Sequence, residues 1–224
     1  NQFSCGEIML NPSFAALVKN SPILPVLHME SVEDAVNVSR ALFKGGITCA
    51  EIVLRSPVAL DCIKAVAEQV PEMTVGVGTL TTPQQVKDSV AAGAQFLVSP
   101  SFTKTLATAM IDTGLPMLPG VVSPSEITQA LELGITEVKF FPAAQYGGAK
   151  TIKALSSVFS QVKFCPTGGV SLGNMAEYFA NKSIFAVGGS WMVPKDLIAN
   201  KDWDAITLLC QQAIAAINDL DKCA

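Results

Sequence analysis

Lys139 lies in a short apolar run, residues 137–142 (EVKFFP), which is an unfavourable place for a charged amine. The run has the β-branched and aromatic side chains typical of a buried strand. Burial favours the neutral amine, and a neutral amine is a nucleophile that condenses with a carbonyl group to form a Schiff base. Lys139 therefore indicates either metal-independent carbonyl chemistry or a structural ion pair with a buried carboxylate.

A carboxylate and a guanidinium occur together in a second apolar run, residues 50–55 (AEIVLR). Because side chains alternate along a strand, Glu51 and Arg55 share one face of this run. Glu51 could transfer protons for a carbinolamine and an enamine, and Arg55 could hold a substrate carboxylate through paired hydrogen bonds. The structural alternative is a salt bridge from Glu51 to Lys139 with Arg55 at a solvated rim, and spacing alone leaves both open.

Two glycine-rich turns follow later apolar runs, at residues 166–169 (PTGG) and 188–190 (GGS). Glycine lets backbone N–H groups approach an anion closely, and a following helix adds partial positive charge. Two such turns at the positions where barrels commonly hold phosphate indicate an anion site, whereas a single diglycine is more often only a turn. An earlier run, residues 74–79 (TVGVGT), has two glycines on one face, which either leave space for a ligand or ease a crowded interior.

The elements that must position these groups alternate regularly along the chain. Eight apolar runs predict strands, at residues 23–28, 49–55, 73–79, 95–99, 115–119, 137–142, 162–166 and 184–188. Stretches with helical spacing separate them, for example residues 32–43, 59–70, 83–92 and 123–133. This order favours a single (β/α)8 barrel domain over residues 1–224, with an extra helix near residues 12–19 and a final helix near 205–220. A doubly wound open sheet is the runner-up fold, although no GxGxxG follows the first strand.

Composition narrows the partners. With 224 residues, 50% of them hydrophobic, and a formal charge of -4, the chain is large enough for one barrel and has no basic run for nucleic acid or an anionic membrane. The single histidine, His28, excludes a multi-histidine metal site and is predicted to be a packed or hydrogen-bonded residue at a strand end. Six cysteines without a CxxC pair indicate a reducing cytosol, and hence a cytoplasmic protein.

An ordered set of short motifs resembles the 2-keto-3-deoxy-6-phosphogluconate (KDPG) aldolase family, whose members also cleave 4-hydroxy-2-oxoglutarate. The motifs run over nearly the whole chain: EIVLR at 51–55, GVGT at 76–79, VSP at 98–100, LPG at 118–120, VKFFPA at 138–143, FCPTGG at 164–169 and GGSW at 188–191. The resemblance implies a class I aldolase on a (β/α)8 barrel that forms a homotrimer and needs no metal or other cofactor. Its substrate would be a phosphorylated keto acid, and pyruvate would be one product.

The resemblance also implies a role for each matching residue. Lys139 would form the Schiff base and Glu51 would be the general acid/base. The remaining substrate contacts would be Arg55 and Thr79 for the pyruvyl carboxylate, Phe141 and Pro100 for the pyruvyl pocket, Thr167 near the C4 hydroxyl, and Gly168, Gly169, Gly189 and Ser190 for the phosphate.

Three positions depart from the usual family pattern, namely Ser56-Pro57, Ser101 and Ala144. They lie in loops that shape the aldehyde pocket, so the aldehyde preference stays open. Cleavage of 4-hydroxy-2-oxoglutarate to pyruvate and glyoxylate needs the same pyruvyl half-site. The residues are also compatible with an aldolase for the C4-epimeric phosphogalactonate substrate, a phosphate-binding barrel isomerase or synthase, and a non-catalytic metabolite-binding protein.

Overall fold

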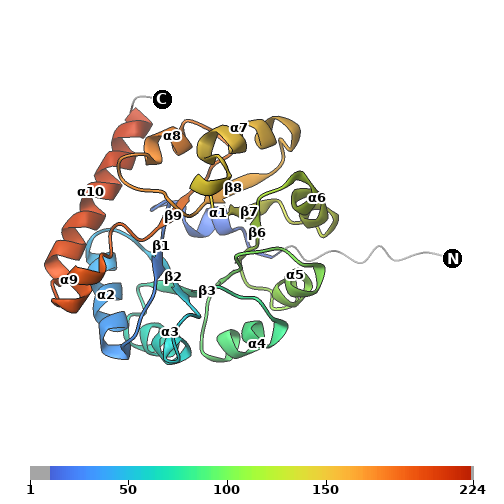
Figure 1. The fold of residues 1–224 in the computed structure, drawn as a ribbon. Helices are drawn as coiled ribbons and strands as arrows, with labels where there is room; N and C mark the ends of the chain where they lie inside the picture. Colours follow the sequence, from blue (N-terminus) through green and yellow to red (C-terminus); the bar gives the residue numbers. More distant parts are fainter. Residues whose placement is uncertain (1–10, 223–224) are drawn as a thin grey trace.

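The computed structural model describes residues 11–222 as an α/β fold in which helices surround parallel strands (Figure 1). The strands are β1 (Ile23–Leu27), β2 (Cys49–Val53), β3 (Thr74–Gly78), β4 (Leu97–Val98), β5 (Met117–Leu118), β6 (Gly120–Val121), β7 (Glu137–Phe140), β8 (Lys163–Pro166) and β9 (Val187–Gly189). The helices are α1 (Phe14–Leu17), α2 (Val32–Lys44), α3 (Ala59–Gln69), α4 (Pro83–Ala91), α5 (Lys104–Ile111), α6 (Pro124–Glu132), the 3-10 helix η1 (Ala144–Tyr146), α7 (Gly148–Val158), α8 (Met175–Phe179), α9 (Lys195–Ala199) and α10 (Trp203–Lys222).

The strands form a curled sheet in two hydrogen-bonded ladders. Six strands pair in the order β5-β4-β3-β2-β1-β9, and β6-β7-β8 form the second ladder. Pro119 separates β5 from β6; it has no N–H to donate, but its carbonyl accepts from the Lys139 N–H at 2.8 Å. Single parallel bridges, Phe164↔Ile184 and Thr167↔Gly188, connect the second ladder to the β9 side. The α/β class and the parallel sheet predicted from the sequence are confirmed.

Side-chain alternation divides the apolar residues into two clusters. Val138 and Phe140 of β7, like Ile52 of β2, belong to the large cluster between the strands and the helices. The smaller cluster lies among the strands, and it contains Phe14, Val18, Leu24, Cys49, Phe96, Val98, Leu118, Cys165 and Ala186. The strands therefore bury both faces, as parallel strands do.

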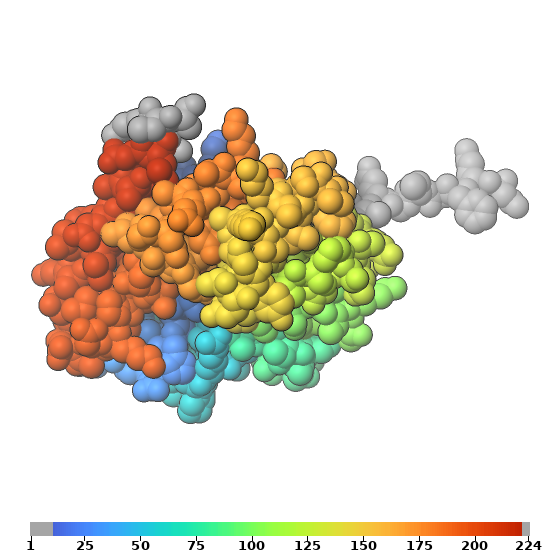
Figure 2. Space-filling model, turned by 45° about the horizontal axis from the view of Figure 1, so that its top comes forward, coloured from blue at the N-terminus to red at the C-terminus, as the bar shows by residue number. Residues whose placement is uncertain are grey.

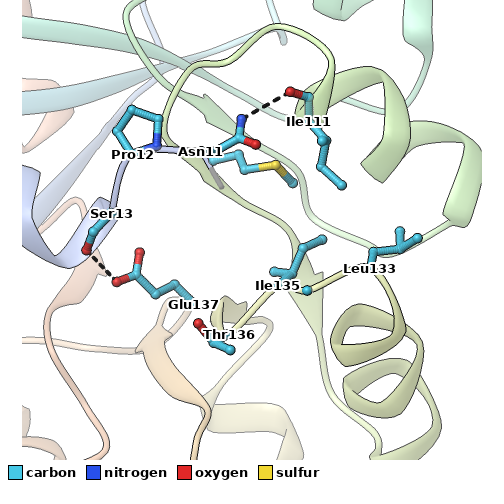
Figure 3. A pocket seen from close by; sticks show the side chains of 10 residues that line it. Asn11, Pro12, Ser13, Ile111, Leu133, Ile135, Thr136 and Glu137 are labelled. Carbon is cyan, nitrogen blue, oxygen red and sulfur yellow. Dashed lines mark hydrogen bonds between the residues drawn. The ribbon is translucent and has the colours of Figure 1, made fainter. Parts of the chain in front are cut away.

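Helix α1 covers the N-terminal end of the strands and occupies the region predicted to hold an extra helix. Phe14 is fully buried in the inner cluster, with its ring 5.1 Å from that of Phe96 in an edge-on arrangement. Glu137, at the start of β7, holds this helix: its carboxylate accepts from the Ser13 hydroxyl at 2.6 Å and from the Phe14 N–H at 2.5 Å. Figure 3 shows Glu137 and Ser13 at one side of a cavity of about 280 Å³ at this end.

Helix α10 packs against α2 and closes the helical layer. In Figure 2 the red and orange C-terminal part of the chain lies on the same side of the molecule as the blue N-terminal part. Gly45, at the end of α2, allows this approach, because a Cβ there would collide with the Cβ of Cys210. The helix begins at Trp203, two residues before the predicted start. Within residues 11–222, no helix combines the length and the apolar character needed to cross a membrane.

Candidate active site

Lys139 and Glu51 meet among the strands as a buried ion pair. Lys139 Nζ lies 2.9 Å from Glu51 Oε1, and the two residues are 5% and 0% exposed. The sheet register fixes this meeting, because β2 and β7 each present these side chains inward. Glu51 Oε2 is buried and has no hydrogen-bond partner among the described residues. The pair therefore combines the amine of Lys139 with a carboxylate that can carry a proton and that has one oxygen, Oε2, without a partner.

Gly78 gives the Glu51 carboxylate its room. A Cβ at Gly78 would lie 2.5 Å from Glu51 Oε2, which is closer than real contacts allow. At the other interior glycine of β3, Gly76, the Phe96 ring occupies the space where a Cβ would lie. The glycines of β3 thus ease a crowded interior, which was one of the two interpretations of their spacing.

Arg55 and Thr79 lie together at the C-terminal ends of β2 and β3. Arg55 Nε donates to Thr79 Oγ1 at 3.2 Å, and the Arg55 side chain is otherwise exposed. Thr79 has a φ of +65°, a left-handed conformation that is uncommon for a residue other than glycine. Backbone strain of this kind is concentrated at functional sites. The remaining guanidinium donors of Arg55 are available to an anion at this edge.

Phe141 and Pro100 lie on the same end of the strands as Lys139. Lys139 Nζ is 5.4 Å from the centroid of the Phe141 ring, within cation-π range. Pro100 follows β4 and packs closely against β6, because a Cβ at Gly120 would collide with the Pro100 carbonyl group. Gly120 in turn pairs with Lys139 in the ladder. Pro100 is therefore one strand away from the amine.

Thr167 and the two glycine-rich turns lie at the C-terminal ends of β8 and β9. Thr167 is 5% exposed and bridges to Gly188, where a Cβ would collide with the threonine side chain. Gly168 and Gly169 have φ values of +100° and +77°, which only glycine adopts readily. Gly189 is buried and Ser190 is exposed. The structure thus brings the predicted site residues to one end of the sheet.

A cavity of about 440 Å³ opens beside these residues, and its lining includes Arg55 and Ser190. His28 and Lys195 line it as well, although the motifs did not indicate either residue. His28 Nε2 is 3.4 Å from Glu30 Oε1, so the predicted hydrogen bond is present. The strand alternation Leu24, Val26, His28 was a signal that could have placed His28 on this inner rim.

Two inner cysteines flank the ion pair but are not nucleophiles. Burial, with a smaller effect of Glu51, raises the pKa of Cys49 to about 12. Burial likewise raises the pKa of Cys165, the partner of Lys139 in the ladder, to about 12. Both thiols stay protonated at neutral pH, so Lys139 is the candidate nucleophile. Across residues 11–222, no group of three or more His, Cys, Asp or Glu side chains is arranged to hold a metal ion.

Comparison with known proteins matches this arrangement. A family model described as "Aldolase: KDPG and KHG aldolase" matches residues 14–209. The "KHG/KDPG aldolase" of Escherichia coli K12 is 42% identical over 202 residues, covering 90% of this chain and 95% of the relative. A structure of KDPG aldolase from Legionella pneumophila, with pyruvate captured as a covalent carbinolamine, is 44% identical with a TM-score of 0.86 and covers 89% of this chain and 97% of that one.

A second solved structure is the Zymomonas mobilis aldolase with 3-phosphoglycerate, which is 38% identical with a TM-score of 0.83. The match covers 89% of this chain and 94% of the Zymomonas mobilis chain. Matches of this length extend over the strands, the glycine-rich turns and the ion pair alike.

Proposed function

Because this chain belongs to the KDPG and KHG aldolase family, we propose that it is a class I aldolase that cleaves 2-keto-3-deoxy-6-phosphogluconate to pyruvate and glyceraldehyde 3-phosphate. This makes it a metal-independent carbon-carbon lyase. The observation that carries the proposal is the buried contact between Lys139 and Glu51, with Oε2 of Glu51 left free.

In the proposed reaction, Lys139 passes a proton to Glu51, and the neutral amine attacks the C2 carbonyl of the substrate and forms a carbinolamine. Glu51 delivers the proton that lets water leave, which gives an iminium ion on Nζ. Glu51, again a carboxylate, then takes the C4 hydroxyl proton, which it later returns to C3; the C3–C4 bond breaks and its electron pair moves toward the iminium nitrogen. The aldehyde leaves, an enamine remains, protonation at C3 restores the iminium ion, and water releases pyruvate.

The other side chains would hold the substrate around this centre. Arg55 and Thr79 are proposed to bind the pyruvyl carboxylate, and their 3.2 Å hydrogen bond supports a shared site. Phe141 and Pro100 would line the pyruvyl pocket, and Thr167 would contact the substrate near C4. The phosphate would lie on the turns at Gly168, Gly169, Gly189 and Ser190.

We also propose that the two ladders close into a complete (β/α)8 barrel, that residues 1–224 form one domain, and that the protein is a cytoplasmic homotrimer. Two observations support closure. Single bridges join the β8 side of the second ladder to the β9 side of the first, and only one residue, Pro119, separates β5 of the first ladder from β6 of the second. The buried free cysteines Cys49, Cys62, Cys165 and Cys210 support a reducing compartment. Cys5 and Cys223 lie outside the described residues.

A second substrate, 4-hydroxy-2-oxoglutarate, is favoured by the double name of the 42%-identical E. coli relative. It shares the pyruvyl half with the first substrate and replaces the phosphorylated aldehyde with glyoxylate. The pyruvyl side chains would therefore act identically on both substrates.

The proposal is tested by reducing the protein with borohydride in the presence of pyruvate and mapping the adduct by peptide mass spectrometry. We expect a single adduct on Lys139 and none on Lys163, a nearby lysine at the exposed start of β8. Lys139→Met is the matched control and should give no adduct. Correctly folded protein without an adduct on Lys139 would exclude Schiff-base chemistry.

A further inference from the structure

His28 continues the inward-facing side of β1 beyond the end of the strand. Leu24 belongs to the inner cluster and Val26 pairs with Glu51, so the next residue on that side is His28. The register between Leu24 and Gly188 places β9 on the other flank, with Ser190 on the same inward side. His28 therefore stands between the ends of β2 and β9.

The 440 Å³ cavity at this place has two cationic side chains in its lining, Arg55 and Lys195. Its lining includes Arg55, His28 and Lys195 together with the Ser190 hydroxyl, and no Asp or Glu lines it among the described residues. Two acidic residues, Glu30 and Asp34, line an adjoining cavity that His28 and Lys195 also line. A cavity that is lined by cationic side chains and by no carboxylate is suited to bind an anion.

The polar side chains that line this cavity make few hydrogen bonds or ion pairs with other residues. His28 Nδ1 is buried without a hydrogen-bond partner among the described residues, and Nε2 has a 3.4 Å contact with Glu30, which is 84% exposed. Lys195 is exposed and pairs with no carboxylate within residues 11–222. Lys195 thus has donor capacity to spare beside Ser190, and the His28 ring has one nitrogen, Nδ1, without a partner.

We propose that His28 and Lys195, beside Ser190, bind the distal phosphate of the substrate, and so determine the preference for a phosphorylated aldehyde over glyoxylate. This inference rests on the proposed aldolase function. A phosphate dianion takes several charge-assisted hydrogen bonds, more than a glycine turn and one hydroxyl supply. Glyoxylate carries its single carboxylate closer to the bond that breaks, and would leave this wall empty.

The test compares His28→Ala and Lys195→Met with Lys44→Met, which removes an exposed lysine that pairs with Asp204 outside the cavity. We expect KM for the phosphorylated substrate to rise about fivefold to twentyfold in the first two variants, as for a lost charge-assisted hydrogen bond. KM for 4-hydroxy-2-oxoglutarate and the borohydride trapping of pyruvate should stay within about twofold of wild type, and Lys44→Met should match wild type throughout.

Binding of inorganic phosphate, followed by titration calorimetry, provides a readout that does not depend on turnover. We expect the affinity to fall about fivefold or more in both cavity variants. Unchanged phosphate affinity, or an equal rise in KM for both substrates, would overturn the inference. A missing pyruvate adduct on wild-type Lys139 would overturn the aldolase function instead, and phosphate titration would then still decide whether this wall binds the anion.

Discussion

Lys139 and Glu51 stabilise each other at a position where neither would be tolerated alone. Moving either charge out of water costs several kcal/mol, and only a close partner with good geometry offsets that cost. The 2.9 Å contact supplies such a partner. The same contact keeps a proton donor within reach of the amine, so a pair that stabilises the resting protein also serves the reaction proposed for it.

Lys139→Met should abolish turnover and also destabilise the fold, because Glu51 is left buried without its cation. We expect a loss of about 3–5 kcal/mol in the free energy of unfolding, measured by urea denaturation and circular dichroism. The double variant Lys139→Met/Glu51→Gln removes the stranded charge and should recover at least half of this loss. Equal stability of the single and double variants would show that the pair is not electrostatically coupled.

Buried thiols should make stability fall at alkaline pH. Burial raises the pKa of Cys49, Cys165 and Cys210 to about 12, whereas the pKa of an unfolded thiol is about 8.5. The stabilising contribution is complete below the unfolded value and is lost as pH rises through this window, by about 2 kcal/mol per thiol at pH 10. Urea unfolding at pH 7 and pH 10, with reductant, measures it.

Cys210→Ala is the matched control for the thiols, since alanine keeps the Cβ that packs on Gly45. This variant should lose its share of the alkaline decline while its stability at pH 7 changes less. A decline of the same size as in wild type would contradict the assignment to buried thiols.

Among the elements, β3 shows how a strand makes room for chemistry on its neighbour. Gly78→Ala should push the Glu51 carboxylate away from Lys139, because the new Cβ would lie 2.5 Å from Oε2. We expect kcat to fall about tenfold to a hundredfold, a range typical for a displaced general acid/base. Gly173→Ala, whose Cβ would be 3.8 Å from its nearest neighbour, should leave the rate unchanged. A normal rate in Gly78→Ala would separate Glu51 from catalysis.

The strands that sequence periodicity predicts well are those whose alternation is uninterrupted. The run at 49–55 became β2 with Glu51 inward, and Val138 and Phe140 of β7 face the helices as expected. The runs at 95–99 and 115–119 gave only two-residue strands. Pro116 and Pro119 flank β5 and cannot donate to a ladder, and the two-residue strand β6, which starts at Gly120, was not predicted.

The candidate site was predictable where a charged residue lies inside an apolar run. Lys139 and Glu51 were conspicuous for that reason, and the two turns were conspicuous for their paired glycines; the structure brings all of them to one end of the sheet. Lys195 follows Pro194 on a short exposed helix, where a lysine is ordinary, so no local pattern distinguishes it. Lys195 lines the same cavity as Arg55 only because the fold brings together residues that are far apart in sequence.

At the scale of the whole molecule, the proposed assembly is open to direct measurement. Light scattering of the purified chain should give three times the 23.5 kDa mass of one copy, since closed cyclic assemblies have a fixed number of subunits. The mass should be constant over a tenfold range of concentration. A mass equal to one or two copies would contradict the homotrimer.

The helix α1, with Phe14 and Val18 buried among the strands, seals the N-terminal end of the sheet. In the proposed reaction, the substrate should therefore enter, and both products should leave, at the opposite, C-terminal end of the strands. In the proposed reaction the pyruvyl group stays covalently bound to Lys139 after the C3–C4 bond breaks, so the aldehyde should leave first and pyruvate should follow. Product-inhibition kinetics should reveal this order of release. Pyruvate should trap the enzyme as an imine, and the aldehyde should bind only to the pyruvate-loaded form.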